Sequence, residues 1–253
     1  MIRRLAVLAF ALAWNTSALA MVGGAATADR SVAQHVALIV GSRGTSCTGV
    51  VIARNLVLTA AHCALPGADY KIVEFDAARH PMLRDVSQVM AHPEFNLNTL
   101  LGHRATADVA LLRLKAPLPA AFVPAPLATQ RTVAIGDRFL VAGYGVAVRG
   151  DGRSGGTIRV ADLVATGQPG TLQIRLVDAA TNGARAGLSA CTGDSGAPVF
   201  DTSKGGLAIV GIVSWSTGPA LSDGCGGLTG VTPLTRYRDW IVEAAAKMGA
   251  PLP

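Results

Sequence analysis

The sequence has little charge and few long apolar runs. Only 15% of its 253 residues are charged, which is too few for a protein built from long solvent-facing helices. After residue 20, no apolar stretch approaches the roughly 20 residues that a membrane-spanning helix needs, so we expect no stable membrane anchor. Dense blocks of lysine and arginine with interleaved aromatic residues are also lacking, which argues against nucleic acid as a partner.

Hydrophobic residues and glycine are abundant instead. Half of the chain is hydrophobic and 29 residues are glycine, so a buried core is expected and disorder is not. Short runs rich in β-branched residues are separated by Gly, Pro, Asn and Asp, as in strands joined by tight turns. We expect strands at 36–40, 47–52, 56–59, 109–114, 138–141, 172–177, 199–200 and 207–215. Their spacing predicts an all-β sandwich or barrel.

The first twenty residues resemble a secretory signal. Arg3 and Arg4 precede an apolar run at 5–14, and the small-residue sequence Ala-Leu-Ala follows at 18–20. A membrane anchor is the alternative, but polar residues at 15–17 interrupt the run before it could span a bilayer. We therefore expect a secreted or periplasmic protein that loses residues 1–20.

Three other segments have a distinct composition. The segment 116–130 contains four prolines and is expected to be an irregular connection, because proline breaks helices and central strands. The glycine-rich stretch 150–156 lacks the Lys-Ser/Thr ending of a phosphate loop and is expected to be a mobile surface loop. Apolar residues at three-to-four spacing in 233–248, with Gly249 beyond them, predict an amphipathic helix.

The four cysteines favour disulfides over a metal site. None of them belongs to a C-x-x-C motif and no matching histidine pair is present, so a zinc site is not expected. In an oxidising compartment all four can pair, and three connectivities are open. The cysteines are Cys47, Cys63, Cys191 and Cys225.

Three short segments suggest nucleophilic catalysis. In Gly193-Asp194-Ser195-Gly196 a serine is flanked by glycines, although such a tetrapeptide by itself is more often an ordinary turn. A serine hydroxyl needs a base within hydrogen-bond reach and a third group that orients the base. His62 follows an apolar strand and precedes a cysteine, and Asp108 immediately precedes another apolar strand. We expect Ser195 as nucleophile, His62 as base and Asp108 as the orienting carboxylate.

The segments 59–63, 108–112 and 193–198 resemble the three signature segments of trypsin-like serine proteases, in the same order. Further similarity at 92–96, 143–145, 214–216 and 238–241 extends the resemblance over 22–242. The family's fold is all-β, with two six-stranded antiparallel β-barrels and a C-terminal α-helix. The resemblance implies one protease domain at 21–253. Its parts would be a first barrel at about 32–115, a connection at about 116–130, and a second barrel with the helix at about 131–248.

The resemblance also implies roles for these residues. His62 would take the proton of Ser195 during attack, and Asp108 would hold the imidazole. The backbone N–H groups of Gly193 and Ser195 would form the oxyanion hole. The family pairing of cysteines would join Cys47 to Cys63 and Cys191 to Cys225.

The sequence after the signal suggests how the enzyme is activated. Residues 21–24 are similar to the Ile-Val-Gly-Gly start of active family members, whose α-ammonium inserts beside the aspartate before the catalytic serine. That aspartate is Asp194 in this chain. Cleavage after Ala20 would expose Met21 directly, so signal peptidase alone would generate the active enzyme. The alternative is a cut elsewhere followed by trimming.

The residues of the expected specificity pocket are uncharged. Ser189 lies six positions before the nucleophile, at the expected pocket floor, and cannot pair with a buried cation. With Ala190 it favours an apolar or aromatic side chain before the cut. Ser216 could narrow the pocket entrance and Thr232 could widen its back wall, so the size preference stays open. The other expected substrate contacts are backbone pairing with Ser214, Trp215 and Ser216, and Gly230.

Taken together, these features predict a serine endopeptidase acting on protein or peptide substrates. A noncatalytic binding module on the same scaffold and an esterase are the alternatives, although Ser195 lacks the G-x-S-x-G setting of esterases. We expect a monomer without cofactor or metal, because Glu74 and Asp76 alone make a weak calcium-loop pattern. A proteinaceous inhibitor is a further possible partner.

Overall fold

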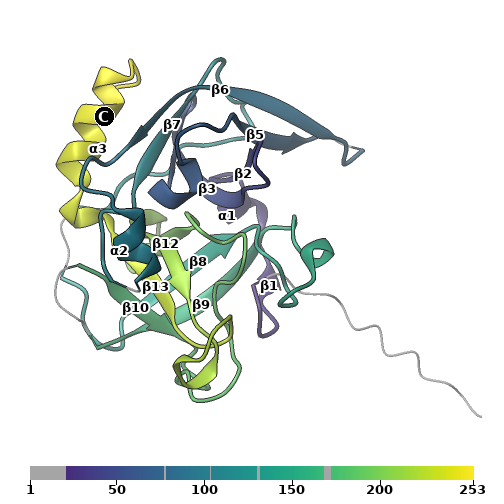
Figure 1. Cartoon of the computed structure of the whole chain (residues 1–253), viewed down its shortest axis with the longest axis vertical. Helices are drawn as coiled ribbons and strands as arrows, with labels where there is room; N and C mark the ends of the chain where they lie inside the picture. The colour runs from purple at the N-terminus through teal and green to yellow at the C-terminus, as the bar shows by residue number, and fades with distance from the viewer. Residues whose placement is uncertain (1–20, 77, 103, 130–131, 168–171) are drawn as a thin grey trace, which may run out of the picture.

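A computed structural model describes residues 21–253 except 77, 103, 130–131 and 168–171. The expected signal segment, 1–20, lies outside the described residues. Two β-barrels lie one above the other in Figure 1, and the C-terminal helix α3 runs along one side of the first barrel. The structure therefore has the predicted all-β class, with two closed six-stranded antiparallel barrels and a C-terminal helix.

The first barrel closes in the strand order β2-β3-β4-β7-β6-β5. Its strands are β2 (Val36–Gly41), β3 (Ser46–Ala53), β4 (Leu56–Thr59), β5 (Tyr70–Phe75), β6 (Pro81–Ala91) and β7 (Ala110–Leu114). The central strands are rich in Val, Leu and Ile, which pack well on a pleated surface. All four residues of β4 are buried, and so are four of the five residues of β7.

The second barrel closes through the pairing of β8 with β9. Its strands are β8 (Arg138–Gly143), β9 (Arg159–Thr166), β10 (Ile174–Val177), β11 (Pro198–Asp201), β12 (Ala208–Ser216) and β13 (Thr229–Pro233). A short N-terminal strand, β1 (Ala26–Thr27), adds to the outer edge of β9. The N-terminal segment is thus attached to the second barrel, before the chain enters the first.

The helices are short except at the C-terminus. Helix α1 (Arg30–Ala33) is capped by Asp29, and α2 (Leu97–Leu101) is capped by Asn96, whose side chain accepts a hydrogen bond from a backbone N–H. Helix α3 covers Arg238–Lys247, with Gly249 in the left-handed region after it. The 3₁₀ turns are η1 (Ala61–Ala64), η2 (Gly152–Ser154), η3 (Pro219–Leu221) and η4 (Leu234–Arg236).

The predicted helix at 233–248 is shorter in the structure. Pro233 ends β13, and the turn η4 precedes α3. The glycine-rich stretch 150–156 lies largely at the surface, and it contains η2 and a buried Ser154. The Ser154 hydroxyl accepts hydrogen bonds from Ala147 N and Val148 N, each at 3.0 Å.

The connection between the barrels is irregular, as its prolines predict. Within the described residues of 116–130, the backbone forms one isolated bridge, from Leu127 to Ile209 of β12. In the part of the chain that the structure covers, no helix has the length and apolar character needed to cross a bilayer.

Candidate active site

His62 and Asp108 come together because β4 and β7 are neighbours. Thr59 at the end of β4 pairs with Ala110 at the start of β7, so the turn after β4 meets the residue before β7. His62 Nδ1 lies 2.8 Å from Asp108 Oδ2, and Asp108 Oδ1 accepts the His62 backbone N–H at 3.0 Å. This double contact fixes both the main chain and the ring of the histidine.

Asp108 receives a third hydrogen bond from the second barrel. The Ser214 hydroxyl donates to Asp108 Oδ2 at 2.5 Å, and Asp108 is only 1% exposed. Hydrogen bonds from both barrels thus fix the orientation of this carboxylate. Asp108 can therefore orient His62 while remaining an acceptor.

Ser195 faces the same space from the second barrel. His62 and Ser195 both line a cavity of about 460 Å³ between the barrels, together with Thr192 and Gly193. The turn around Ser195 requires glycine, because Gly193 and Gly196 have φ of +94° and +79°. A Cβ on Gly196 would come within 2.1 Å of Thr59 Oγ1.

The N–H groups predicted to form the oxyanion hole are available. Among the described residues, the Gly193 and Ser195 N–H groups donate to no protein acceptor, whereas the N–H groups of Asp194 and Gly196 donate to the carbonyls of Cys191 and Val213. Two free donors on one turn can bind an oxyanion.

Thr48 contacts this turn in a way that the sequence did not indicate. It is fully buried next to Cys47, and its hydroxyl donates to the Gly193 carbonyl at 2.8 Å while accepting Tyr144 N–H at 3.0 Å. Its own N–H donates to the Ser195 carbonyl at 2.8 Å. Thr48 thus connects the first barrel to the residues on both sides of Asp194. A threonine after a cysteine carries no sequence signal for such a role.

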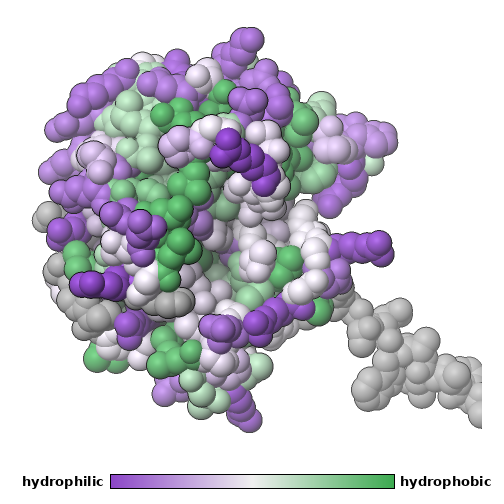
Figure 2. All heavy atoms as spheres, viewed as in Figure 1, coloured by the Kyte–Doolittle hydropathy of each residue, from purple (hydrophilic) through white to green (hydrophobic). Residues whose placement is uncertain are grey.

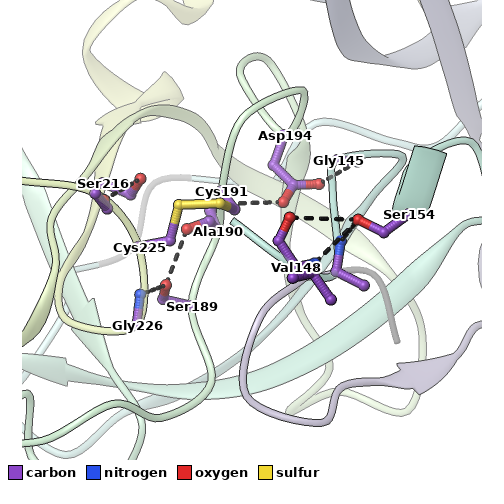
Figure 3. Close-up of a disulfide and its surroundings, with 12 residues drawn as sticks. Gly145, Val148, Ser154, Ser189, Ala190, Cys191, Asp194, Ser216, Cys225 and Gly226 are labelled. Carbon is purple, nitrogen blue, oxygen red and sulfur yellow. Dashed lines mark hydrogen bonds between the residues drawn. A yellow bond between two sulfur atoms is a disulfide. The ribbon is translucent and has the colours of Figure 1, made fainter. Parts of the chain in front are cut away.

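Asp194 is completely buried behind the nucleophile turn. Its Oδ1 accepts Gly145 N–H at 2.8 Å and its Oδ2 accepts Cys191 N–H at 2.9 Å (Figure 3). A Cβ on Gly143 would lie 2.1 Å from Asp194 Oδ1, which explains the need for glycine there. Burial raises the pKa of Asp194 to about 7, and the two backbone hydrogen bonds oppose this shift only in part. The two hydrogen bonds therefore do not offset the full free-energy cost of burying the carboxylate's negative charge.

The segment starting at Met21 docks beside this region. Met21 is fully buried in the core of the second barrel, and Val22 forms an antiparallel bridge with Ser189. A Cβ on Gly23 would come within 2.3 Å of the Gly187 backbone, so these two segments of the chain are in close contact. Met21 has φ of +48°, in the left-handed region that a side chain disfavours.

Both disulfides have the pairing that the resemblance implied. Cys47–Cys63 has an S–S distance of 2.05 Å, and Cys191–Cys225 has one of 1.95 Å. The first bridge holds the residue next to His62 against β3, and the second lies beside Asp194 (Figure 3). The two sulfurs near His62 share this bond, so they are not thiolate ligands for a metal.

The expected specificity pocket has a hydrogen-bonded floor. Ser189 and Ala190 are at most 1% exposed. The Ser189 hydroxyl donates to the Ala190 carbonyl at 2.9 Å and accepts Gly226 N–H at 2.6 Å (Figure 3). Both hydrogen-bonding functions of this hydroxyl are used within the protein, which leaves a weakly polar floor.

Trp215 and Ser216 line the cavity between the barrels. The indole of Trp215 lies against Gly230, where a Cβ would come within 2.0 Å of the Trp215 ring. The Ser216 hydroxyl donates to the Gly224 carbonyl at 3.2 Å. Ser216 is therefore tied to the opposite loop, and Gly230 is covered by an aromatic ring. Thr232 is buried in β13.

The two acidic residues considered for calcium have protein partners. Glu74 Oε2 accepts hydrogen bonds from Arg84 at 2.9 and 2.7 Å, and Asp76 contacts the His80 ring at 3.1 Å. An arginine thus occupies the position at Glu74 that a cation would need.

Two closed antiparallel barrels with this cavity between them define the chymotrypsin-like class of fold. A family model described as Trypsin matches residues 21–241. The chain belongs to the Trypsin family. It is a serine protease, a hydrolase with protein substrates.

Curated relatives agree with this membership. The chain is 32% identical over 215 residues to the vitellin-degrading protease of Bombyx mori, covering 78% of this chain and 75% of the relative. It is 29% identical over 240 residues to trypsin alpha of Drosophila melanogaster, covering 89% and 87%. Among solved structures, human heparin binding protein aligns with a TM-score of 0.69 and 24% identity, covering 91% of this chain and 99% of that one. This structural likeness concerns the fold alone.

Proposed function

We propose that the protein is a secreted or periplasmic serine endopeptidase in which Ser195, His62 and Asp108 form the catalytic triad. The observation that carries this proposal is the cavity lined by both Ser195 and a histidine held by a buried carboxylate. The two unoccupied N–H groups on the Ser195 turn support an oxyanion hole at the same place.

The reaction follows the mechanism of the family's well-studied members. His62 takes the hydroxyl proton as Ser195 attacks the scissile carbonyl, and then gives that proton to the leaving amine. Gly193 and Ser195 N–H groups stabilise the oxyanion, and the loss of one such donor costs about 3 kcal/mol in comparable sites. Water then hydrolyses the acyl-enzyme, with His62 again acting as base.

Activation would follow removal of residues 1–20. Met21 has a left-handed φ while residues 1–20 are attached, and cleavage before Met21 would free its amine to move. A freed α-ammonium beside Asp194 would compensate a carboxylate whose pKa burial otherwise raises to about 7. Signal cleavage alone would then produce the active form. N-terminal sequencing tests this step, because fully active enzyme that starts upstream of Met21 would contradict it.

The substrate residue before the cut would be uncharged. Ser189 offers no carboxylate, and its hydroxyl is already hydrogen-bonded at both ends. Binding a lysine or arginine there would leave a buried cation unpaired. The peptide would pair with the edge formed by Ser214 and Ser216 as an added strand. We further propose that the enzyme is a monomer and that a proteinaceous inhibitor could occupy the same cleft.

A serine-directed phosphonate followed by a peptide-library profile tests the proposal. We expect stoichiometric labelling of Ser195 and cleavage after apolar or aromatic residues. Labelling without peptide cleavage would indicate an esterase. No labelling of the folded protein that begins at Met21 would indicate a noncatalytic binding module.

A further inference from the structure

A second groove continues from the catalytic cavity. It has a volume of about 420 Å³ and shares Trp215 and Ser216 with the cavity around Ser195. One wall consists of α2 with the loop after it, and the other consists of β10 and the loop after β12. Its lining residues that carry the following argument are Leu100, Leu101, Arg104, Arg175, Leu221 and Asp223.

Two arginines and one aspartate line this groove. Arg175 projects from β10, and its Nε is buried without a hydrogen-bond partner in the described part of the chain. Arg104 is exposed, and none of the ion pairs formed among the described residues involves it. Asp223 is exposed on the facing loop and offsets one of the two positive charges. The groove therefore keeps an excess positive charge.

Apolar side chains surround these charges. Leu101 and Leu221 are 67% and 69% exposed, and they contribute to the groove from α2 and η3. Figure 2 shows hydrophobic surface over α2 next to hydrophilic surface. Apolar walls exclude water and reduce the local dielectric constant, which strengthens the attraction between a guanidinium and an anion. Exposed leucines beside arginines suit a ligand that is both apolar and acidic.

We propose that this groove selects substrates with an acidic side chain on the amino-terminal side of the scissile bond, and that Arg175 and Arg104 determine this specificity. The inference rests on the proposed endopeptidase function. A peptide paired with Ser214 and Ser216 would continue into the groove, because Trp215 and Ser216 line both cavities. A carboxylate can accept two parallel hydrogen bonds from a guanidinium. The guanidinium groups of Arg175 and Arg104, which both line the groove, would supply these hydrogen bonds to the substrate.

Matched peptide pairs test this specificity. Starting from the best library sequence, each position from the second to the fifth before the cut carries Glu in one peptide and Gln in the other. We expect kcat/KM to favour Glu about tenfold at one position, as a charge-assisted pair would give. The preference should decrease at high salt, because ions screen the partly exposed pair.

Variants assign the effect to the two arginines. In Arg175→Gln/Arg104→Gln we expect the ratio of kcat/KM for the Glu peptide to kcat/KM for the Gln peptide to fall to about one. Arg30→Gln, on the exposed helix α1, is the matched control and should keep the wild-type ratio. Thermal melting of each variant establishes that it is folded.

The results separate this inference from the function on which it rests. Wild-type enzyme that cleaves the Gln peptides but shows no Glu preference at any position would overturn the acidic specificity alone. The same ratio in the double variant as in wild type would also overturn the role of the arginines. Failure of the phosphonate to label Ser195 would instead overturn the proposed function, and this inference with it.

Discussion

The Thr48 hydroxyl donates a hydrogen bond to the Gly193 carbonyl at 2.8 Å, across the boundary between the two barrels. The same oxygen accepts Tyr144 N–H, and Thr48 N–H holds the Ser195 carbonyl. The orientation of the peptide groups around Ser195 therefore depends on a residue of the first barrel. We assign Thr48 as a positioning residue for the proposed oxyanion hole.

Replacement of Thr48 by valine should impair this positioning. Thr48→Val keeps the shape but leaves the Gly193 carbonyl and Tyr144 N–H without their partner, a loss of about 1–3 kcal/mol for each buried group. We expect kcat to fall about tenfold with little change in KM, because the defect acts on transition-state stabilisation. Steady-state kinetics on one peptide measure the two constants. Thr48→Ser retains the hydroxyl and should restore most of kcat; an equal loss in the serine variant would contradict the role.

Asp108 should contribute far more to kcat than carboxylates elsewhere on the protein. Asp108→Asn keeps the size of the side chain but replaces the oxygen that faces His62 Nδ1 with an NH2 donor, so the imidazole adopts the wrong tautomer. We expect kcat to fall about 10⁴-fold, as in well-studied family members. Asp239→Asn, on the exposed side of α3, is the control and should be neutral. A loss below tenfold in folded Asp108→Asn would argue against the triad.

A methyl group on Gly230 should displace Trp215. The Cβ of Gly230→Ala would come within 2.0 Å of the indole, which must therefore move. Because Trp215 lines both the catalytic cavity and the adjoining groove, we expect peptide kcat/KM to fall at least tenfold and the tryptophan emission to shift. Gly206→Ala is a matched control, since no atom lies within 4 Å of its added Cβ. Unchanged fluorescence and kinetics in Gly230→Ala would contradict this packing.

Much of the barrel architecture follows from local sequence. Runs such as 36–40 and 56–59 are apolar at nearly every position, because each lies inside a closed barrel. The strands β5, β6, β9 and β13 lie outside the predicted ranges. In β6 most residues are exposed, and its sequence, with Arg84 and Asp85, has neither alternation nor a continuous apolar run. It forms because β5 and β7 both pair with it. This stabilisation comes from tertiary contacts that no window of sequence contains.

The candidate site likewise contains some residues that the sequence identified and others that only the structure revealed. His62, Asp108 and Ser195 stand in short motifs with unusual neighbours, so their residue types and order were sufficient to select them. Thr48 and Arg175 lie in ordinary strand sequence. The role of Thr48 comes from its contact with Gly193, which lies 145 positions away in the sequence. The role of Arg175 comes from the groove that it lines. Such relationships depend on how the two barrels meet.

The state of the Met21 amine should determine how stability depends on pH. In a form that retains Leu19 and Ala20, burial raises the pKa of Asp194 from its ordinary 3.8 to about 7. Between these values the folded protein binds a proton that the unfolded chain has lost, so stability should fall as pH rises from about 4 to about 7. In the form that begins at Met21, the proposed ion pair raises the amine pKa above about 8 and lowers that of Asp194. This form should keep its stability through neutral pH and lose it only as pH rises through the raised amine pKa.

Melting temperatures of the two forms between pH 4 and pH 9 measure this difference. We expect the difference in melting temperature between the two forms to increase up to pH 7, where it should be on the order of 5 °C or more for a domain of this size. Asp194→Asn in the extended form removes the titrating group and should flatten its profile, because a neutral amide needs no compensating cation. Peptidase activity should be lost in the extended form and present in the form that begins at Met21. Parallel melting profiles together with equal activity would show that Asp194 does not depend on the Met21 amine, and the free amine would then have no part in activation.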